Sequence, residues 1–137
     1  MNKNLAFLIS KLSRYQKKYL NLHLKDTDLE DSQAVILLKI KEHINITPKE
    51  IFEMRIVEKP SVTKILKKLE ELEYIKKVYS ENDGRSYSVA ITDKGLNMCY
   101  FIEKIIVELN SRYEKLISDR FSEDLTKILN EIYDEYV

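Results

Sequence analysis

The fold of this chain is decided by residues 80–95, which read SENDGRSYSVAITDKG. This stretch holds both glycines of the 137-residue chain. Larger apolar side chains alternate with small ones over residues 87–91, the period of a half-buried strand. Residues 74–79 can form its partner strand. We therefore predict a hairpin whose tip is residues 81–85, with Gly84 at positive φ.

A long amphipathic helix is predicted directly before this hairpin, over residues 59–73. Its apolar positions recur at helical spacing and are Val62, Ile65, Leu66, Leu69 and Leu72. A charged face on such a helix is, by itself, typical of many soluble proteins. A helix of this kind followed by a hairpin with Arg85 at its tip is typical of a winged helix, a DNA-binding fold.

The rest of the chain is predicted to be helical. Apolar spacing indicates a long first helix over residues 5–22 and a strongly apolar, buried helix over residues 33–42. Residues 47–50, TPKE, combine an N-cap, an early proline and a capping-box glutamate, which starts a short third helix. Another long helix begins near Asp93, and a last one is capped by Ser122. The fold class is mainly α with a small β-hairpin.

Composition limits the partners that this chain can have. Its formal net charge is +0, so net charge gives no support for nucleic-acid binding. The charges are unevenly distributed, however. Residues 1–25 hold six Lys or Arg and no carboxylate, whereas residues 101–137 hold nine Asp or Glu against five Lys or Arg. A neutral total can therefore contain one basic and one acidic surface.

Several classes of protein are excluded or disfavoured. The chain has no nucleophile elbow, phosphate-binding loop, metal cluster or paired His and carboxylate, so we expect neither an enzyme nor a cofactor or metal. No apolar run is long enough to span a membrane. Cys99 is the only cysteine, which excludes an intrachain disulfide and fits a cytoplasmic location. We expect this thiol to be buried and structural, not a redox sensor.

Residues 29–95 resemble the winged helix-turn-helix of MarR-type transcriptional regulators. The most specific motif is Asp83-x-Arg85 followed by the strand into residues 91–95, ITDKG. Residues 59–70, KPSVTKILKKLE, are almost as informative. The order of the flanking helices also matches this family across essentially the full chain.

This resemblance implies a sequence-specific DNA-binding regulator, expected to be a repressor, that binds double-stranded DNA. The recognition helix would enter the major groove, Arg85 would probe the minor groove, and Asp83 would orient Arg85 through a charge-assisted hydrogen bond. Polar residues near the start of the helix would approach bases, and lysines farther along would reach phosphates. The expected DNA-binding residues are Lys59, Pro60, Ser61, Thr63, Lys64, Lys67, Lys68, Asp83 and Arg85.

The chain departs from the family at two turns. Ile56 stands where the family usually has a glycine in the helix-turn-helix turn, and Glu73 stands where a glycine normally ends the recognition helix. Because a residue with a β-carbon at positive φ carries a cost, both turns are expected to be built differently.

The terminal helices are expected to form a homodimer, because their apolar stripes are too extensive to be left in water. We expect residues 1–137 to be a single domain, with residues 1–25 and 96–137 as its helical dimerisation region. The expected dimer contacts are Leu5, Leu8, Leu12, Leu125, Ile128, Leu129 and Ile132.

Two further interpretations accompany this reading. Tyr15, Tyr19 and Tyr100 could line a pocket for a small aromatic effector, as the family resemblance implies, or could be core and interface residues with a polar tip. The chain could also be a winged-helix module that binds protein without specific DNA binding. The basic residues of the expected DNA site favour the first function, since a protein-binding module would not require them.

Overall fold

The computed structural model describes residues 3–132, so the ends of the expected dimerisation region, residues 1–2 and 133–137, lie outside it. These residues fall into two compact units, one that extends to Ile106 and one that begins at Val107, and each is considered by itself. The elements are α1 (Leu5–His23), α2 (Asp31–Lys41), α3 (Pro48–Glu53), α4 (Lys59–Glu71), β1 (Ile75–Tyr79), β2 (Tyr87–Ile91), α5 (Asp93–Glu114) and α6 (Phe121–Ile132).

The predicted fold class and order of elements are confirmed, and the errors are at helix starts. Helix α3 begins with the predicted capping box: the Glu50 amide donates to Thr47 Oγ1 at 3.1 Å, and the Thr47 amide donates to Glu50 Oε1 at 3.2 Å. Helix α2 begins at Asp31, two residues before the predicted start. Helix α6 begins at Phe121, so Ser122 lies in its first turn and does not cap it.

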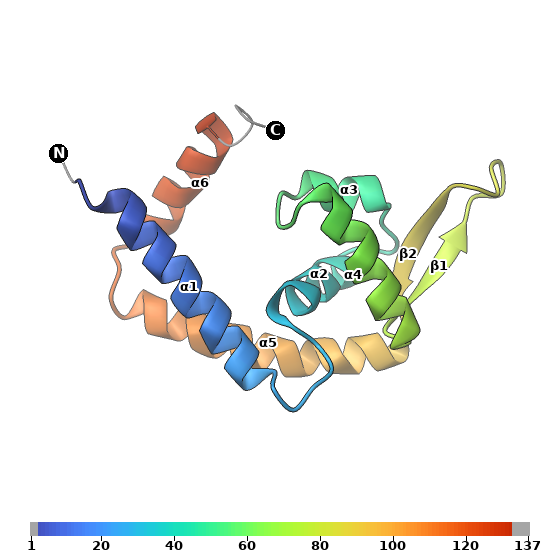
Figure 1. Ribbon diagram of the computed structural model, residues 1–137, viewed down its shortest axis with the longest axis horizontal. Helices are drawn as coiled ribbons and strands as arrows, with labels where there is room; N and C mark the ends of the chain where they lie inside the picture. Colours follow the sequence, from blue (N-terminus) through green and yellow to red (C-terminus); the bar gives the residue numbers. More distant parts are fainter. Residues whose placement is uncertain (1–2, 133–137) are drawn as a thin grey trace. The chain divides into compact units, whose positions relative to one another are not determined.

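Helix α2 forms the centre of the first unit. Figure 1 shows α3, α4 and the hairpin gathered around it. Its buried residues are Ala34, Ile36, Leu37 and Ile40, which explains why its sequence is apolar nearly all round. Helix α4 packs against α2 and α3 through the predicted stripe, with Val62, Ile65, Leu66 and Leu69 buried. Burial of this stripe fixes which side of α4 is left for solvent.

The predicted hairpin is present and antiparallel, and its register runs from Ile75 opposite Ile91 to Tyr79 opposite Tyr87. A third segment joins it, which the sequence did not indicate. The Ile46 amide donates to the Val89 carbonyl at 3.0 Å, and the Val89 amide donates to the Ile46 carbonyl at 2.8 Å. This bridge ties the segment before α3 to the base of the hairpin.

The tip of the hairpin differs from the prediction, because Gly84 does not have a positive φ. Asp83 determines the turn instead. Its carbonyl accepts from the Ser86 amide at 3.1 Å, and its carboxylate accepts from the Arg85 amide at 3.0 Å and the Ser86 hydroxyl at 3.1 Å. Asp is favoured at the first position of a type I turn, whose central residues both have negative φ. Glycine is therefore not needed at this tip for its conformational freedom.

The two turns that flank the basic helix both contain a left-handed residue with a side chain. In the helix-turn-helix turn this residue is Arg55, with φ 61°, and not Ile56, which is half-buried one position later. At the end of α4 it is Glu73, with φ 64°. In the first turn, the left-handed residue therefore lies one position before Ile56. In the second turn, Glu73 has the left-handed backbone at the position where the resemblance implies a glycine.

The end of α4 is a Schellman motif with Glu73 at C′. The Tyr74 amide donates to the Leu69 carbonyl at 3.0 Å, and the Glu73 amide donates to the Glu70 carbonyl at 2.9 Å. Both Leu69 and Tyr74 are buried, as the apolar contact of this motif requires. Gly95 in α5 lies directly against this motif, because a β-carbon added there would overlap the Tyr74 carbonyl oxygen.

We expect Gly95→Ala to lower the free energy of unfolding by about 2 kcal/mol, within the range for overpacked sites. Backbone atoms of Tyr74 cannot move aside without breaking the Schellman motif. Gly84→Ala is the matched control, since nothing lies within 4 Å of an added β-carbon there and φ is not positive. Its expected change is below about 0.5 kcal/mol. Urea denaturation followed by circular dichroism measures both, and equal stability of the two variants would contradict the close approach.

Candidate nucleic-acid interface

Helix α4 separates its apolar and basic side chains by burial. Thr63, Lys64, Lys67 and Lys68 are exposed, whereas the residues between them pack into the core. The helix begins after Glu58, whose carbonyl accepts from the Ser61 amide at 3.0 Å. Pro60 lies in the first turn, where its missing N–H would have had no partner in the helix. The predicted DNA-binding residues of α4 therefore share one solvent-facing side.

The wing, defined here as residues 75–91, has Arg85 exposed at its tip. Asp83 makes the predicted charge-assisted hydrogen bond with Arg85, and the donor is the backbone amide. The carboxylate thus fixes the backbone from which the arginine side chain extends. Asp83 and Arg85 are brought together by this turn, while the α4 residues form a separate part of the same unit.

Sequence reasoning missed a basic and aromatic cluster along the wing. The Lys77 ammonium lies 4.8 Å from the centroid of the Tyr87 ring and 4.0 Å from Glu70 Oε1 in α4. The Tyr79 and Tyr87 rings are neighbours, with centroids 6.2 Å apart. Alternation along the two predicted strands could have placed Lys77, Tyr79 and Tyr87 on one face. Through the contact of Lys77 with Glu70, this cluster connects the wing to the C-terminal end of α4.

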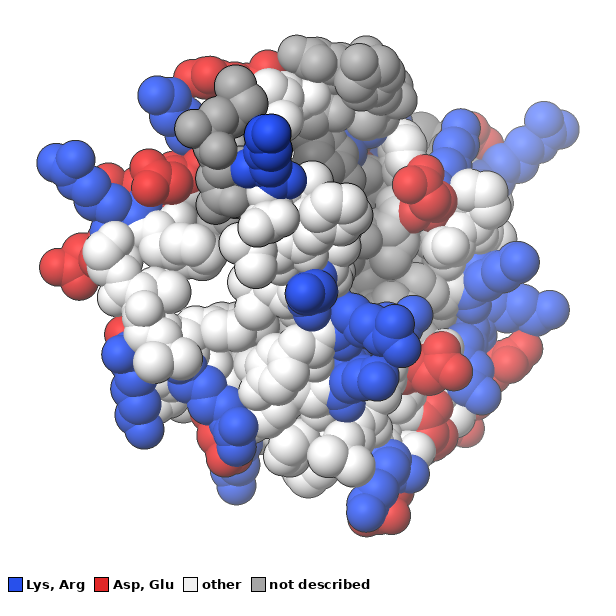
Figure 2. Space-filling view, turned by 60° about the vertical axis from the view of Figure 1, so that its left-hand side comes forward, with Lys and Arg blue, Asp and Glu red and all other residues white. Residues whose placement is uncertain are grey.

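The predicted dimer residues are apolar side chains that the single chain leaves in solvent. Leu5 and Leu8 in α1 are 53% and 51% exposed, and Leu129 in α6 is 52% exposed. Helix α6 has no buried residue at all. Figure 2 shows one broad area of uncharged residues, with Lys and Arg and also Asp and Glu side chains around it. The remaining predicted dimer residues, Leu12, Leu125, Ile128 and Ile132, are also exposed.

The three predicted effector tyrosines do not share one environment. The Tyr15 and Tyr19 rings are neighbours at 6.1 Å between centroids, and Tyr19 also stacks on His23 at 4.2 Å. Tyr19 is buried, whereas Tyr15 is exposed. Tyr100 is exposed on α5, where its ring centroid lies 5.3 Å from the Lys41 ammonium. The structure therefore places two of these residues together on α1 and the third in a contact with α2.

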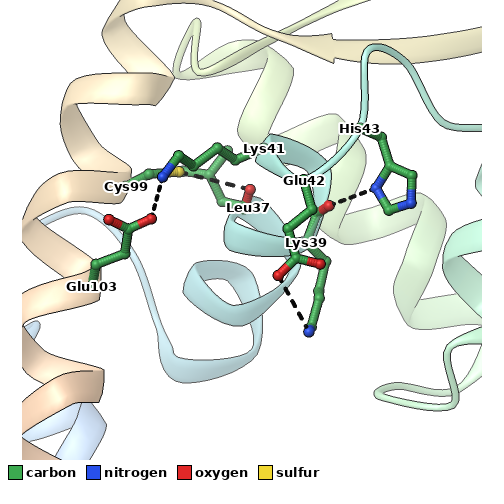
Figure 3. A network of polar contacts seen from close by, with 7 residues as sticks. All are labelled: Leu37, Lys39, Lys41, Glu42, His43, Cys99 and Glu103. Carbon is green, nitrogen blue, oxygen red and sulfur yellow. Dashed lines mark hydrogen bonds and ion pairs between the residues drawn. The ribbon is translucent and has the colours of Figure 1, made fainter.

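Cys99 is buried, as predicted, and is fully excluded from solvent. Its thiol donates to the Leu37 carbonyl oxygen at 3.7 Å. Burial raises the pKa of Cys99 to about 11 despite the nearby Lys41 ammonium. Figure 3 shows Lys41 directed to the Glu103 carboxylate, and this hydrogen bond raises the pKa of Lys41. A protonated, inaccessible thiol is the opposite of what a reactive cysteine requires.

Over residues 3–132, no three His, Cys, Asp or Glu side chains come close enough to hold a metal ion. Within the same residues, none of the helices combines the length and apolar character needed to cross a bilayer.

Known proteins match this chain over most of its length. The HTH-type transcriptional regulator BilQ of Clostridioides difficile is 27% identical over 131 residues, which cover 96% of this chain and 88% of BilQ. The HTH-type transcriptional regulator SarZ of Staphylococcus aureus is 28% identical over 130 residues, which cover 94% of this chain and 86% of SarZ.

Solved structures show the same fold. The MepR–DNA complex of S. aureus has a TM-score of 0.83 at 19% identity and covers 96% of this chain and 97% of that one. A mutant MarR from E. coli in complex with operator DNA has a TM-score of 0.78 at 22% identity, with 95% and 94% covered. Residues 29–87, from before α2 into β2, match the MarR family itself. The chain therefore resembles MarR-family proteins, since residues 29–87 match that family and the fold matches solved MarR-type structures over most of the chain.

Proposed function

We propose that this protein is a DNA-binding transcriptional regulator that recognises a pseudo-palindromic operator as a homodimer. Helix α4 enters the major groove, Arg85 enters the minor groove, and the regulator acts as a repressor in the cytoplasm. The observation that carries the proposal is the exposed basic side of α4, joined in one folded unit to a wing with an exposed arginine at its tip.

The chemistry of these residues fits the two parts of DNA recognition. Lys67 and Lys68 lie beyond the first turn of α4, where long cationic side chains reach phosphates. Ser61 and Lys64 lie nearer the end of the helix that points into a groove, where they can meet base edges. The relatives support DNA binding in general, since BilQ and SarZ are named as transcriptional regulators and MarR and MepR have been solved with DNA.

The exposed apolar stripes and the geometry of operators support the proposed homodimer. Exposed apolar patches beyond a few hundred Å² mark interaction surfaces, and α1 and α6 both present such residues. A two-fold operator is read by two recognition helices about one turn of DNA apart, which a dimer supplies. A small aromatic effector that binds near Tyr15, Tyr19 or Tyr100 would release the operator by changing that separation.

In vitro selection from a random duplex pool tests the function. Enrichment of one sequence with two-fold symmetry would support it. Failure to enrich any sequence at low salt would overturn it, and the chain would then be a winged-helix module that binds protein.

Removing the arginine of the wing should weaken binding to the selected duplex. We expect Arg85→Ala to cost about 1–3 kcal/mol of binding free energy, since one groove contact is lost. The fold should be unaffected, because an exposed hairpin tip contributes little to the core. Arg120→Ala is the matched control, as it removes the same charge from an exposed position outside residues 29–95, defined here as the winged unit. Fluorescence anisotropy titrations measure both, and equal affinities would contradict the role of Arg85.

Two lysines of α4 should differ in what they contribute. Lys68→Ala should weaken binding to all duplexes alike and reduce the slope of log K against log salt by about 0.9, as expected for one lost phosphate contact. Lys64→Ala should instead cost about 1–3 kcal/mol on the selected duplex and little on a scrambled one. Titrations of both duplexes at several salt concentrations separate these effects. If the two lysines exchange behaviour, α4 docks with a different rotation about its axis.

A charge in the apolar stripe of α6 should disrupt the dimer. We expect Leu129→Glu to dissociate the protein at micromolar concentration, because a carboxylate cannot be buried there without a partner. Asn130→Glu adds the same charge at the next position, on the polar side of α6, and should remain dimeric. Sedimentation velocity measures both. A wild-type monomer at this concentration would refute the homodimer.

A further inference from the structure

The end of α4 is held by residues from outside the helix-turn-helix. Lys94 Nζ donates to the Leu72 carbonyl at 2.8 Å, and Thr92 Oγ1 donates to the Glu73 carbonyl at 2.6 Å. The Thr92 amide also donates to the Tyr74 carbonyl at 3.1 Å. These carbonyls belong to the last turn of α4 and the Schellman motif that ends it. The start of α5 thus supplies the partners that a helix terminus lacks.

Tyr74 extends this contact to a third segment. Its side chain is buried, and its hydroxyl donates to Asp28 Oδ1 at 2.9 Å, in the connection between α1 and α2. The Lys94 ammonium lies 5.1 Å from the centroid of the Tyr74 ring. Burial and the bond to Asp28 raise the pKa of Tyr74 to about 12, so the hydroxyl keeps its proton and remains a donor.

This junction, defined as Asp28, Tyr74, Thr92 and Lys94, joins the recognition helix to both exits from the winged unit. One exit is the connection to α1, and the other is the start of α5. Lys94 makes two of the contacts, to a carbonyl and to an aromatic ring. Glu73, with its left-handed backbone, lies in the chain between these two contacts. A residue with a side chain keeps this costly conformation only where the surrounding contacts hold it in place.

We propose that Tyr74 and Lys94 are positioning residues for DNA binding, which hold the end of α4 at a fixed angle to α1 and α5 and so set the separation of the two recognition helices in a dimer. The inference rests on the proposed function. It assigns these residues no contact with DNA. Their effect is on simultaneous engagement of two half-sites, and engagement of one half-site does not depend on them.

The test compares the duplex selected by the wild-type protein with the same duplex in which one half-site is scrambled. Tyr74→Phe removes the hydroxyl and keeps the ring, and Lys94→Met removes the ammonium and keeps most of the chain. Each should lower the ratio of full-site to half-site affinity about five- to tenfold, in the range of coupling between linked sites. Half-site affinity should change less than about twofold.

Matched controls separate positioning from general loss. Lys104→Met removes an exposed lysine from α5, outside the junction and the wing. This variant should keep the wild-type ratio. Asp28→Asn retains an oxygen acceptor for Tyr74 and should also keep it, whereas Asp28→Ala should match Tyr74→Phe. Equal loss on both duplexes, or an unchanged ratio, would overturn the proposal.

Hydrogen exchange of the free protein gives a second readout that does not depend on DNA. The amides of residues 71–75 should exchange faster in Tyr74→Phe and Lys94→Met than in the wild type and the controls. Unchanged exchange would overturn the positioning role. If no duplex is enriched by the wild-type protein, the proposed function fails, and exchange still decides whether Tyr74 and Lys94 hold the end of α4.

Discussion

The structure of the winged unit depends on the close approach of Gly95 to the Tyr74 carbonyl. Helix α4 ends, β1 begins and α5 begins at this one place, so their mutual positions are determined by backbone contacts that tolerate no extra atom. Hydrogen bonds from Thr92 and Lys94 satisfy the carbonyls that the end of α4 leaves without helical partners. A change in the direction of α5 would therefore be transmitted to α4 directly, without an intervening flexible loop.

Burial is distributed unequally between the winged unit and the terminal helices. Helices α2 and α4 bury most of their apolar side chains within one chain, whereas α1 buries only Tyr19 and Leu20 and α6 buries none. The winged unit therefore has its own core, whereas α1 and α6 leave most of their apolar side chains exposed. In the proposed dimer, the winged unit would fold independently of the interface.

The sequence predicted those features that depend on local chemistry. The capping box at Thr47 and the stripe of α4 were correct, because each rests on residues within two turns of one another. The positive φ expected for Gly84 is wrong, because Asp83 closes a turn that does not require a positive φ at that residue. The bridge at Ile46 was missed because a single paired residue leaves no alternating pattern. The junction at Tyr74 joins segments 46 residues apart, which no local pattern can indicate.

The charges of α4 are not arranged for the stability of the helix itself. The helix dipole favours carboxylates in the first turn and cations in the last, by about 0.3–1 kcal/mol each. Within α4 the first turn carries Lys59 and no carboxylate, and the last turns carry Glu70 and Glu71 beside Lys68. Helix α6, in contrast, begins with two carboxylates, as the dipole favours. The Lys59 ammonium adds to the positive end of the dipole, whereas the carboxylate of Glu58 at the N-cap offsets it. The exposed lysines farther along α4, Lys64, Lys67 and Lys68, therefore supply the positive charge that suits the polyanionic partner of the proposed function.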